Sequence, residues 1–193
     1  ATPQWFISME KKALRSKAIK SVNETVFYPS KGKERLLSMI EDRPDWCVSR
    51  QRSWGVPLPI FLNKKTKEPL RDQKVIDRIA EIYEKEGSDC WFTDDPKRFL
   101  GKDYKVEDFE KLTDIVEVWF DSGSSHSFVL EKREDLKWPA DMYLEGSDQH
   151  RGWFHSSLLE SCGTRGKAPY ESILSHGFVV DGKGMKMSKS AGN

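Results

Sequence analysis

The sequence predicts an α/β fold with a parallel sheet, because apolar strands alternate with an apolar helix in its last third. A short strand over 142–144, a helix over about 149–162 and a strand over 172–180 follow one another there. A strand–helix–strand unit of this length is typical of a parallel crossover. The second observation is a charged stretch over 62–112, in which helical spacing of apolar residues over 73–86 predicts a small α-rich insertion.

The first 61 residues predict two helices and one extended segment. Apolar residues recur at helical spacing from Met9 to about Lys20, and again from Leu36 to Ile40, where Pro44 ends the pattern. Residues 56–61 have the pattern of extended chain. Eight basic and three acidic side chains give residues 1–35 a net charge of +5. A solvated helix face is the simpler interpretation of this excess, and contact with RNA phosphates stays as the alternative.

The stretch over 62–112 is interpreted as a peripheral insertion with little chemistry. Its main helix, over 73–86, has one apolar face, and the segments after it have the composition of loops. Asp95 and Pro96 are predicted to be the N-cap and first position of a further helix, because proline is favoured at the first helical position.

Composition excludes several classes of protein. The 193 residues carry a net charge of +1, so a strongly basic nucleic-acid coat is excluded. No apolar run approaches the roughly 18 residues that a membrane span requires. Cys47, Cys90 and Cys162 are widely spaced, so neither a disulfide framework nor a cysteine zinc site is expected, and a reducing cytoplasmic setting fits best.

Three polar runs directly follow predicted strands. Residues 121–126 follow a strand over 115–120, residues 145–149 follow the strand over 142–144, and residues 181–190 follow the last strand. Ligands bind at the carboxyl ends of parallel strands. We therefore expect one site built from three strand ends.

The second run has the residue types of a nucleotide or ammonium site. Gly146 would let a ligand approach the backbone, and the carboxylates of Glu145 and Asp148 suit ribose hydroxyls or an ammonium group. An equally good interpretation is that Asp148 only caps the following helix, which Gly163 is predicted to end.

The third run, 181–190, holds two glycines and three lysines, so it could wrap a triphosphate. An exposed cationic turn is the simpler interpretation from composition alone.

The four histidines show no metal-ligand spacing, and we predict no metal site and no catalytic histidine. His126 and His150 lie in the polar runs and are expected to form polar wall. His155 is expected to be solvated on its helix, and His176 to be a hydrogen bonder at a strand end.

The letters of several runs resemble those of class I aminoacyl-tRNA synthetases. Lys186–Ser190 reads KMSKS, a motif of that class. Longer runs resemble the isoleucyl-tRNA synthetases: WCVSRQRSWG (46–55), VWFDSGSSH (118–126), YLEGSDQHRGWF (143–154) and HGFVVDGKGMKMSKS (176–190). Residues 1–9 resemble the stretch where such a chain returns from its editing insertion. The resemblance covers nearly the whole chain and is weakest over 62–112.

The resemblance implies the C-terminal half of a Rossmann-like catalytic domain. Residues 1–61 would return from the editing insertion, 62–112 would be a connective insertion, and 113–193 would end in the KMSKS loop. The His-x-Gly-His motif of the class does not occur here. We therefore expect an excerpt of a longer protein that is inactive alone, without the first half-sheet, the editing domain and the anticodon-binding helices.

The resemblance also implies the chemistry. ATP, as its Mg2+ complex, would activate isoleucine to an adenylate, and the isoleucyl group would pass to tRNA(Ile). Lys186 and Lys189 would be catalytic, with Lys189 stabilising the pyrophosphate charge, a role worth about 3 kcal/mol of barrier. The residues implied to bind ATP or the adenylate are Glu145, Gly146, Asp148, Gln149 and Lys189.

Trp119 and Trp153 resemble the two indoles of the isoleucine pocket, with plain core packing as the alternative. A hydrophobic pocket discriminates one methylene by only about 1–3 kcal/mol, a range for which the isoleucine enzymes are themselves the standard example. The competing hypotheses are a valyl-specific synthetase and a non-catalytic adenosine- or RNA-binding module on a synthetase scaffold. The expected partners are isoleucine, ATP, tRNA(Ile) and the rest of the synthetase chain, without a membrane.

Overall fold

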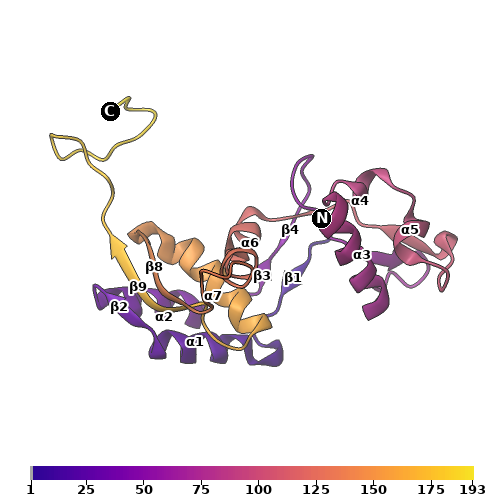
Figure 1. Ribbon diagram of the computed structural model, residues 1–193, viewed down its shortest axis with the longest axis horizontal. Coiled ribbons are helices and arrows are strands. Elements are labelled where there is room, and N and C mark those ends of the chain that lie inside the picture. The colour runs from indigo at the N-terminus through magenta and orange to yellow at the C-terminus, as the bar shows by residue number, and fades with distance from the viewer. Residues whose placement is uncertain (1) are drawn as a thin grey trace. The chain divides into compact units, whose positions relative to one another are not determined.

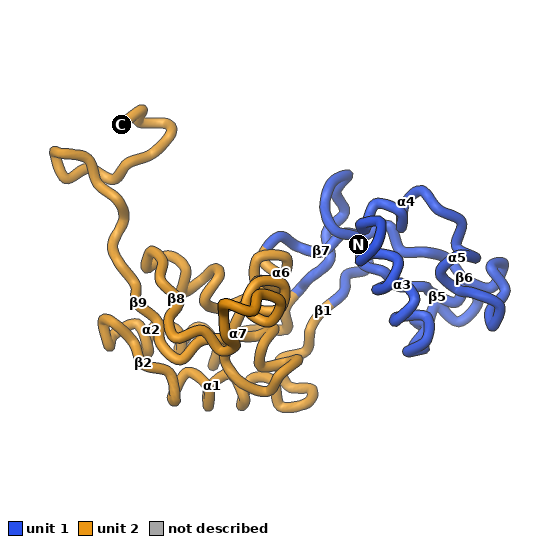
Figure 2. Tube along the Cα trace, in the orientation of Figure 1, with its two compact units in different colours: residues 1–5, 47–118 blue, residues 6–46, 119–193 orange. Residues whose placement is uncertain are grey.

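The computed structural model describes residues 2–193, which form two compact units (Figure 2). The smaller unit consists of the residues up to Trp5 together with Cys47–Val118, and the larger of Phe6–Trp46 together with Trp119–Asn193. Ala1, the first residue of the run over 1–9, lies outside the described residues. The division into 1–61, 62–112 and 113–193 stays a prediction.

A three-stranded parallel sheet is the centre of the larger unit (Figure 1). Its strands, in spatial order, are β2 (Val26–Tyr28), β9 (Tyr170–His176) and β8 (Ala140–Gly146). Helix α7 (Trp153–Thr164) connects β8 to β9. The predicted α/β class and the parallel crossover are therefore confirmed.

Helices cover one face of this sheet. Helix α1 (Leu14–Glu24) follows the short helix η1 (Lys11–Ala13) and packs against both α2 (Lys31–Glu41) and α7. The middle position of each strand faces these helices: Ile173 of β9 pairs in register with Phe27 of β2 and Tyr143 of β8, and all three are buried.

The opposite face of the sheet is apolar and open. Side chains alternate between the faces of a strand, so the neighbours of the buried positions lie on this side. Val26 and Tyr28 are 50% and 53% exposed, and Met142 and Leu144 are 41% and 56% exposed. Parallel sheets occur almost only with both faces covered, so this face has the composition of an interior surface.

The two predicted N-terminal helices are confirmed with shifted bounds. The first begins at Leu14 rather than at Met9, since Lys12 and Ala13 have positive φ angles of 54° and 57°. The second runs over Lys31–Glu41 and is longer than the apolar residues alone indicated.

Gly163 does not end its helix as predicted. Helix α7 continues through it to Thr164, and the left-handed backbone falls at Gly166, with φ 83°. The predicted start of this helix, at about residue 149, was also wrong. Residues Ser147–Arg151 form the separate short helix η4, and α7 begins only after Gly152.

The smaller unit contains two short antiparallel pairs and short helices. Strand β4 (Ser49–Arg50) pairs with β7 (Ile115–Val116), and β5 (Phe61–Asn63) with β6 (Phe109–Lys111). Its helices are α3 (Gln73–Glu86), α4 (Cys90–Thr93), α5 (Pro96–Leu100) and η2 (Val106–Asp108). The short strands β1 (Phe6–Ile7) and β3 (Trp46–Cys47) pair with each other. The predicted helix over 73–86 is confirmed to the residue, and Asp95 caps α5 by accepting from the Lys97 backbone N–H at 2.7 Å.

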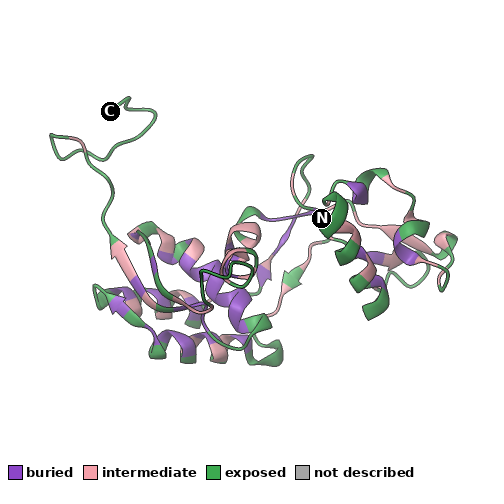
Figure 3. Ribbon diagram, viewed as in Figure 1, coloured by how far each residue is buried: buried purple, intermediate pink, exposed green. Residues whose placement is uncertain are grey.

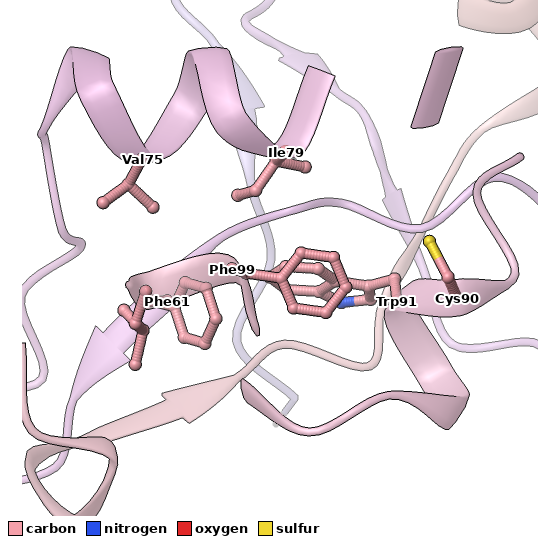
Figure 4. Close-up of a cluster of buried hydrophobic side chains, with 7 residues drawn as sticks. Phe61, Val75, Ile79, Cys90, Trp91 and Phe99 are labelled. Carbon is pink, nitrogen blue, oxygen red and sulfur yellow. The ribbon is translucent and has the colours of Figure 1, made fainter. Parts of the chain in front are cut away.

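The smaller unit has its own aromatic core (Figure 4). The indole of Trp91 lies between the rings of Phe61 and Phe99, with centroids at 5.0 and 5.1 Å. Its Nε1–H donates to the Leu112 carbonyl at 2.8 Å, so the one polar group of this buried side chain is satisfied. Val75 and Ile79 of α3 cover the rings.

The strand predicted over 115–120 is wrong beyond Val116. Strand β7 ends there, and α6 (Val118–Gly123) is a helix, followed by the single π-type turn η3 (His126–Leu130). A short apolar run cannot distinguish a strand from a buried helix. The close approach of Gly123 to α7, where an added Cβ would lie 3.0 Å from the Ser156 carbonyl carbon, is a contact that the local pattern does not reveal.

The last strand ends at His176 rather than at residue 180. The residues after it are almost all exposed (Figure 3). Over residues 2–193, none of the helices has both the length and the apolar character needed to cross a bilayer.

Candidate functional site

Two carboxylates lie at the carboxyl end of β8. Glu145 is the next-to-last residue of the strand, and its Oε2 accepts from the Gly146 backbone N–H at 2.7 Å. An added Cβ at Gly146 would lie only 2.5 Å from Oδ1 of Asp148, so a glycine is needed for this carboxylate to approach the backbone. The strand end therefore holds two acidic side chains around Gly146, which is buried and whose backbone N–H is already bound by Glu145, so the expected approach of a ligand to this backbone is not seen.

Asp148 does not cap a helix, so that interpretation was wrong. Helix η4 has Gly146 at its N-cap and no side-chain cap. The first free N–H of α7 is instead bound by Gln149, whose Oε1 accepts from the Trp153 backbone N–H at 2.9 Å. The other end of that amide donates to Oδ2 of Asp148 at 3.1 Å, so Gln149 connects the carboxylate to the start of α7.

The two tryptophans expected to form a pocket both lie near Gly152. Trp153 is the next residue, and an added Cβ at Gly152 would lie 2.8 Å from Cη2 of Trp119. Trp119 is 40% exposed and Trp153 is half-buried. An indole with this exposure can contact an apolar ligand. An indole that served only to fill the core would be buried.

The Trp153 indole is held on its face and on its edge. Its ring stacks on Tyr143 with centroids 4.0 Å apart and an angle of 5° between the planes. Its Nε1–H donates to Oγ of Ser125 at 2.9 Å. Because Ser125 belongs to the run over 121–126, this hydrogen bond brings that run next to the start of α7.

The run over 121–126 does not reach this place by the predicted route. It is largely helical, and the strand before it, β7, pairs with β4 in a two-stranded antiparallel sheet that is separate from the parallel sheet. The expectation that three ends of one parallel sheet build the site is therefore wrong for this run. A side-chain contact, through Ser125, replaces the strand end.

The loop after β9 carries Lys186 and Lys189. Asp181 holds its turn, with Oδ1 accepting from the backbone N–H groups of Lys183 at 2.8 Å and Met185 at 3.0 Å. Oδ2 accepts from Asn193 at 2.8 Å, and these bonds, led by that from Asn193, lower the pKa of the Asp181 carboxyl.

The two lysines are not brought to the other candidate residues. Nζ of Lys186 lies 3.7 Å from the centre of the Phe178 ring, and Lys189 is exposed. In the described chain, the hydrogen bonds of residues 177–193 all stay within residues 176–193. The structure thus groups Trp119, Trp153 and the β8 end, and leaves the lysine loop apart.

Three of the histidines are buried, and the solvated position expected for His155 was wrong. His155 is 4% exposed, and burial, reinforced by the charges of Arg43 and Arg151, lowers its pKa to about 3. Burial also lowers the pKa values of His126 and His150. All three rings are therefore neutral at physiological pH.

His176 does lie at a strand end, where its Nδ1 is 2.6 Å from the Gly177 carbonyl oxygen. Within residues 2–193, no cluster of three or more histidine, cysteine, aspartate or glutamate side chains is placed to hold a metal ion.

Tyr143 is the site residue that the sequence analysis missed. It is 3% exposed, its hydroxyl lies 3.1 Å from Oγ of Ser157, and burial raises its pKa. The alternation of side chains along β8 could have identified Tyr143 as a buried residue. Its stack on Trp153 joins residues ten apart, on either side of the short helix η4, and no local sequence pattern predicts such a contact.

Comparison with known proteins gives consistent similarities. Residues 1–193 match the family model described as tRNA synthetases class I (I, L, M and V). The chain is 77% identical over 193 residues to the isoleucine–tRNA ligase of Pelagibacter ubique and 57% identical over 198 residues to that of Syntrophotalea carbinolica. All of the chain is covered in both cases, but it spans only about a fifth (21%) of each relative.

One solved structure is similar in fold. It is the ternary complex LeuRS-tRNA-LeuAMS of Agrobacterium radiobacter K84, with a TM-score of 0.50 and 20% identity over 77% of this chain and 22% of that one. At this identity the likeness concerns the fold alone.

Proposed function

The chain belongs to the class I tRNA synthetase family, and from this premise we propose that it is part of an isoleucine–tRNA ligase. The longer parent protein would activate isoleucine with ATP and transfer it to tRNA(Ile). The support is 77% identity to one such ligase over the whole chain, together with two indoles beside a carboxylate-bearing strand end. Because the chain spans about a fifth of its relatives, we expect it to be inactive alone.

Within the parent, the chain would run from the return of the editing insertion to the KMSKS loop. Its parallel sheet would be the second half of a Rossmann-like catalytic domain, and the smaller unit would include the connective insertion. The open apolar face of the sheet supports this placement, because such a face is normally covered by further chain.

The chemistry needs no protein nucleophile. A carboxylate oxygen of isoleucine would attack the α-phosphorus of ATP, bound as its Mg2+ complex, and pyrophosphate would leave. Catalysis then consists of positioning and charge stabilisation. Lys189, with Lys186 beside it, would stabilise the charge on the leaving pyrophosphate.

The end of β8 would bind the adenylate. The carboxylates of Glu145 and Asp148 suit hydroxyl and ammonium donors, Gly146 leaves room for the Asp148 carboxylate beside the strand, and Gln149 connects Asp148 to α7. Two carboxylate acceptors at this strand end would suit the hydroxyl and ammonium donors of an aminoacyl nucleotide.

The observation that carries the isoleucine assignment is the pair Trp119 and Trp153. The Trp119 ring lies against Gly152, Trp153 is the next residue, and both side chains are partly accessible. Two rigid aromatic rings beside one another in the folded chain would suit contact with a branched aliphatic side chain. The further partners would be tRNA(Ile) and the rest of the synthetase chain, in the cytoplasm.

The test is isoleucine-dependent exchange of labelled pyrophosphate into ATP by the full-length parent. We expect Trp153→Ala to raise the isoleucine requirement far more than the ATP requirement. Lys189→Ala should slow exchange by about 100-fold or more, the usual effect of removing one charge-stabilising group. Lys65→Ala, at an exposed lysine of the smaller unit, is the control.

Each alternative predicts a different result. Exchange that depends on valine in preference to isoleucine would identify a valyl enzyme. A folded parent that binds adenosine without any exchange would be a binding module on a synthetase scaffold, and the proposed function would be wrong.

A further inference from the structure

We propose that Tyr143 and Ser125 are positioning residues that fix the Trp153 indole and thereby set the size of the amino-acid pocket. The inference rests on the proposed function, because it takes Trp153 as a wall of the isoleucine pocket. It adds to that function two residues that do not themselves touch the substrate.

Tyr143 provides a rigid surface under the indole. The two rings are nearly parallel, at 5° and with centroids 4.0 Å apart. Tyr143 is itself held from two further directions, by the Tyr170 ring at 4.8 Å and by the Ser157 hydroxyl at 3.1 Å. It is 3% exposed in the middle of β8, so the surface on which the indole lies cannot shift without moving the sheet.

Ser125 supplies the constraint that the stack lacks. A stacked ring can still slide and turn within its own plane. The hydrogen bond from Trp153 Nε1–H to Ser125 Oγ, at 2.9 Å, fixes that rotation at the edge of the ring. The indole N–H can only donate, so a hydroxyl oxygen at this position is an acceptor that an apolar side chain cannot replace.

The two contacts come from different segments. Tyr143 is on β8, and Ser125 lies between α6 and η3, while Trp153 begins α7. The orientation of the indole is therefore set by contacts from two segments other than its own helix. A fixed indole matters for a pocket that must distinguish isoleucine from valine. One methylene changes the discrimination ratio of such a pocket by only about 10–200-fold.

The experiment compares isoleucine and valine in pyrophosphate exchange by the full-length parent. We expect Ser125→Ala and Tyr143→Leu each to lower the ratio of kcat/KM for isoleucine to kcat/KM for valine by about fivefold or more. This is part of the roughly 10–200-fold discrimination that one methylene provides. The KM for ATP should change by less than about twofold, because the ATP contacts are untouched. Ser125→Thr and Tyr143→Phe should restore discrimination, since they keep the hydroxyl and the ring.

Ser127→Ala is the matched control. It removes a hydroxyl two residues along, which accepts from Nη2 of Arg165 at 3.1 Å and does not contact Trp153. If Tyr143→Leu fails to fold, Ser125→Ala decides the matter, because it removes one half-buried hydroxyl and creates little empty space.

The outcomes separate this inference from the proposed function. Wild-type parent without isoleucine-dependent exchange would refute both. Wild-type exchange with an unchanged isoleucine-to-valine ratio in Ser125→Ala would refute the positioning role alone. Parallel losses with both amino acids and with ATP would also refute it, because they indicate a merely structural role.

Discussion

Gly152 lies in direct contact with the indole of Trp119: a Cβ added at position 152 would lie 2.8 Å from Cη2 and 3.0 Å from Cζ3 of that ring. The same Cβ would lie 2.5 Å from Oε1 of Gln149, the atom that accepts from the backbone N–H of Trp153. The absence of a side chain at Gly152 thus lets the Trp119 ring lie against the start of α7.

Gly152→Ala is therefore expected to damage the proposed amino-acid pocket. The methyl group must displace Trp119 or Gln149, and misplacement by about 1 Å can cost on the order of 100-fold in rate. We expect the KM for isoleucine in the parent to rise about tenfold or more, with a smaller change for ATP, measured by pyrophosphate exchange. An unchanged isoleucine KM would show that the contact between Gly152 and Trp119 does not matter for binding.

Gly163→Ala is expected to have the opposite effect, on stability. Gly163 lies within α7, and an added Cβ would meet only Cδ1 of Leu14, at the ordinary contact distance of 3.8 Å. Alanine in a helix is favoured over glycine by roughly 0.5–1 kcal/mol. The thermal unfolding midpoint of the parent should rise, with exchange activity kept; a lower midpoint would show that the helix does not tolerate a methyl group there.

His155 should make the protein less stable as the pH falls. Its pKa is about 3 in the folded state and about 6.5 when unfolded, so between these values only the unfolded state binds the proton. The contribution of neutral His155 to the free energy of unfolding is complete above about pH 6.5, and by pH 5 this free energy has fallen by about 2 kcal/mol. Arg43 and Arg151 act in the same direction, since both charges oppose the imidazolium.

The measurement is the thermal unfolding midpoint of the parent at pH 7 and pH 5, for wild type and for His155→Asn. The variant has no proton to bind at this position, so its midpoint should depend less on pH. Equal pH dependence in the two proteins would mean that His155 is not buried in the parent as it is here.

Asp181→Ala should slow adenylate formation by disordering the lysine loop. The carboxylate holds the backbone N–H groups of Lys183 and Met185 and the side-chain amide of Asn193. We expect pyrophosphate exchange by the parent to fall about tenfold, the amount that one or two hydrogen bonds to a charged group are worth. Asp181→Asn keeps an oxygen for the two N–H groups and should recover part of the rate; equal loss in both variants would point to the charge rather than to the turn.

The elements that local patterns specify were predicted well. Helix α3 was predicted over its full length because its apolar residues recur at helical spacing, and the cap at Asp95 because proline follows it. The parallel relation of β8 and β9 also followed from the strand–helix–strand order alone.

The failures occurred where tertiary contacts decide. The apolar run at 118–120 is helical, although its pattern favoured a strand. Gly163 lies inside α7, although a glycine at this position favoured the end of the helix. His155 is buried, although a solvated position on its helix was predicted. The candidate site shows the same division: its residue types were visible in the sequence, but the Tyr143 stack and the Ser125 hydrogen bond were not, because they join distant segments.

The turn held by Asp181 has a consequence for the energetics of ligand binding by the loop. Fixing the backbone of one residue costs roughly 1–2 kcal/mol of conformational entropy. Residues 181–185 are already ordered by the bonds to Lys183 and Met185, so that part of the cost is met during folding rather than on binding. A triphosphate that engages Lys186 would then meet a partly preorganised segment, and more of its interaction energy would remain available for the transition state.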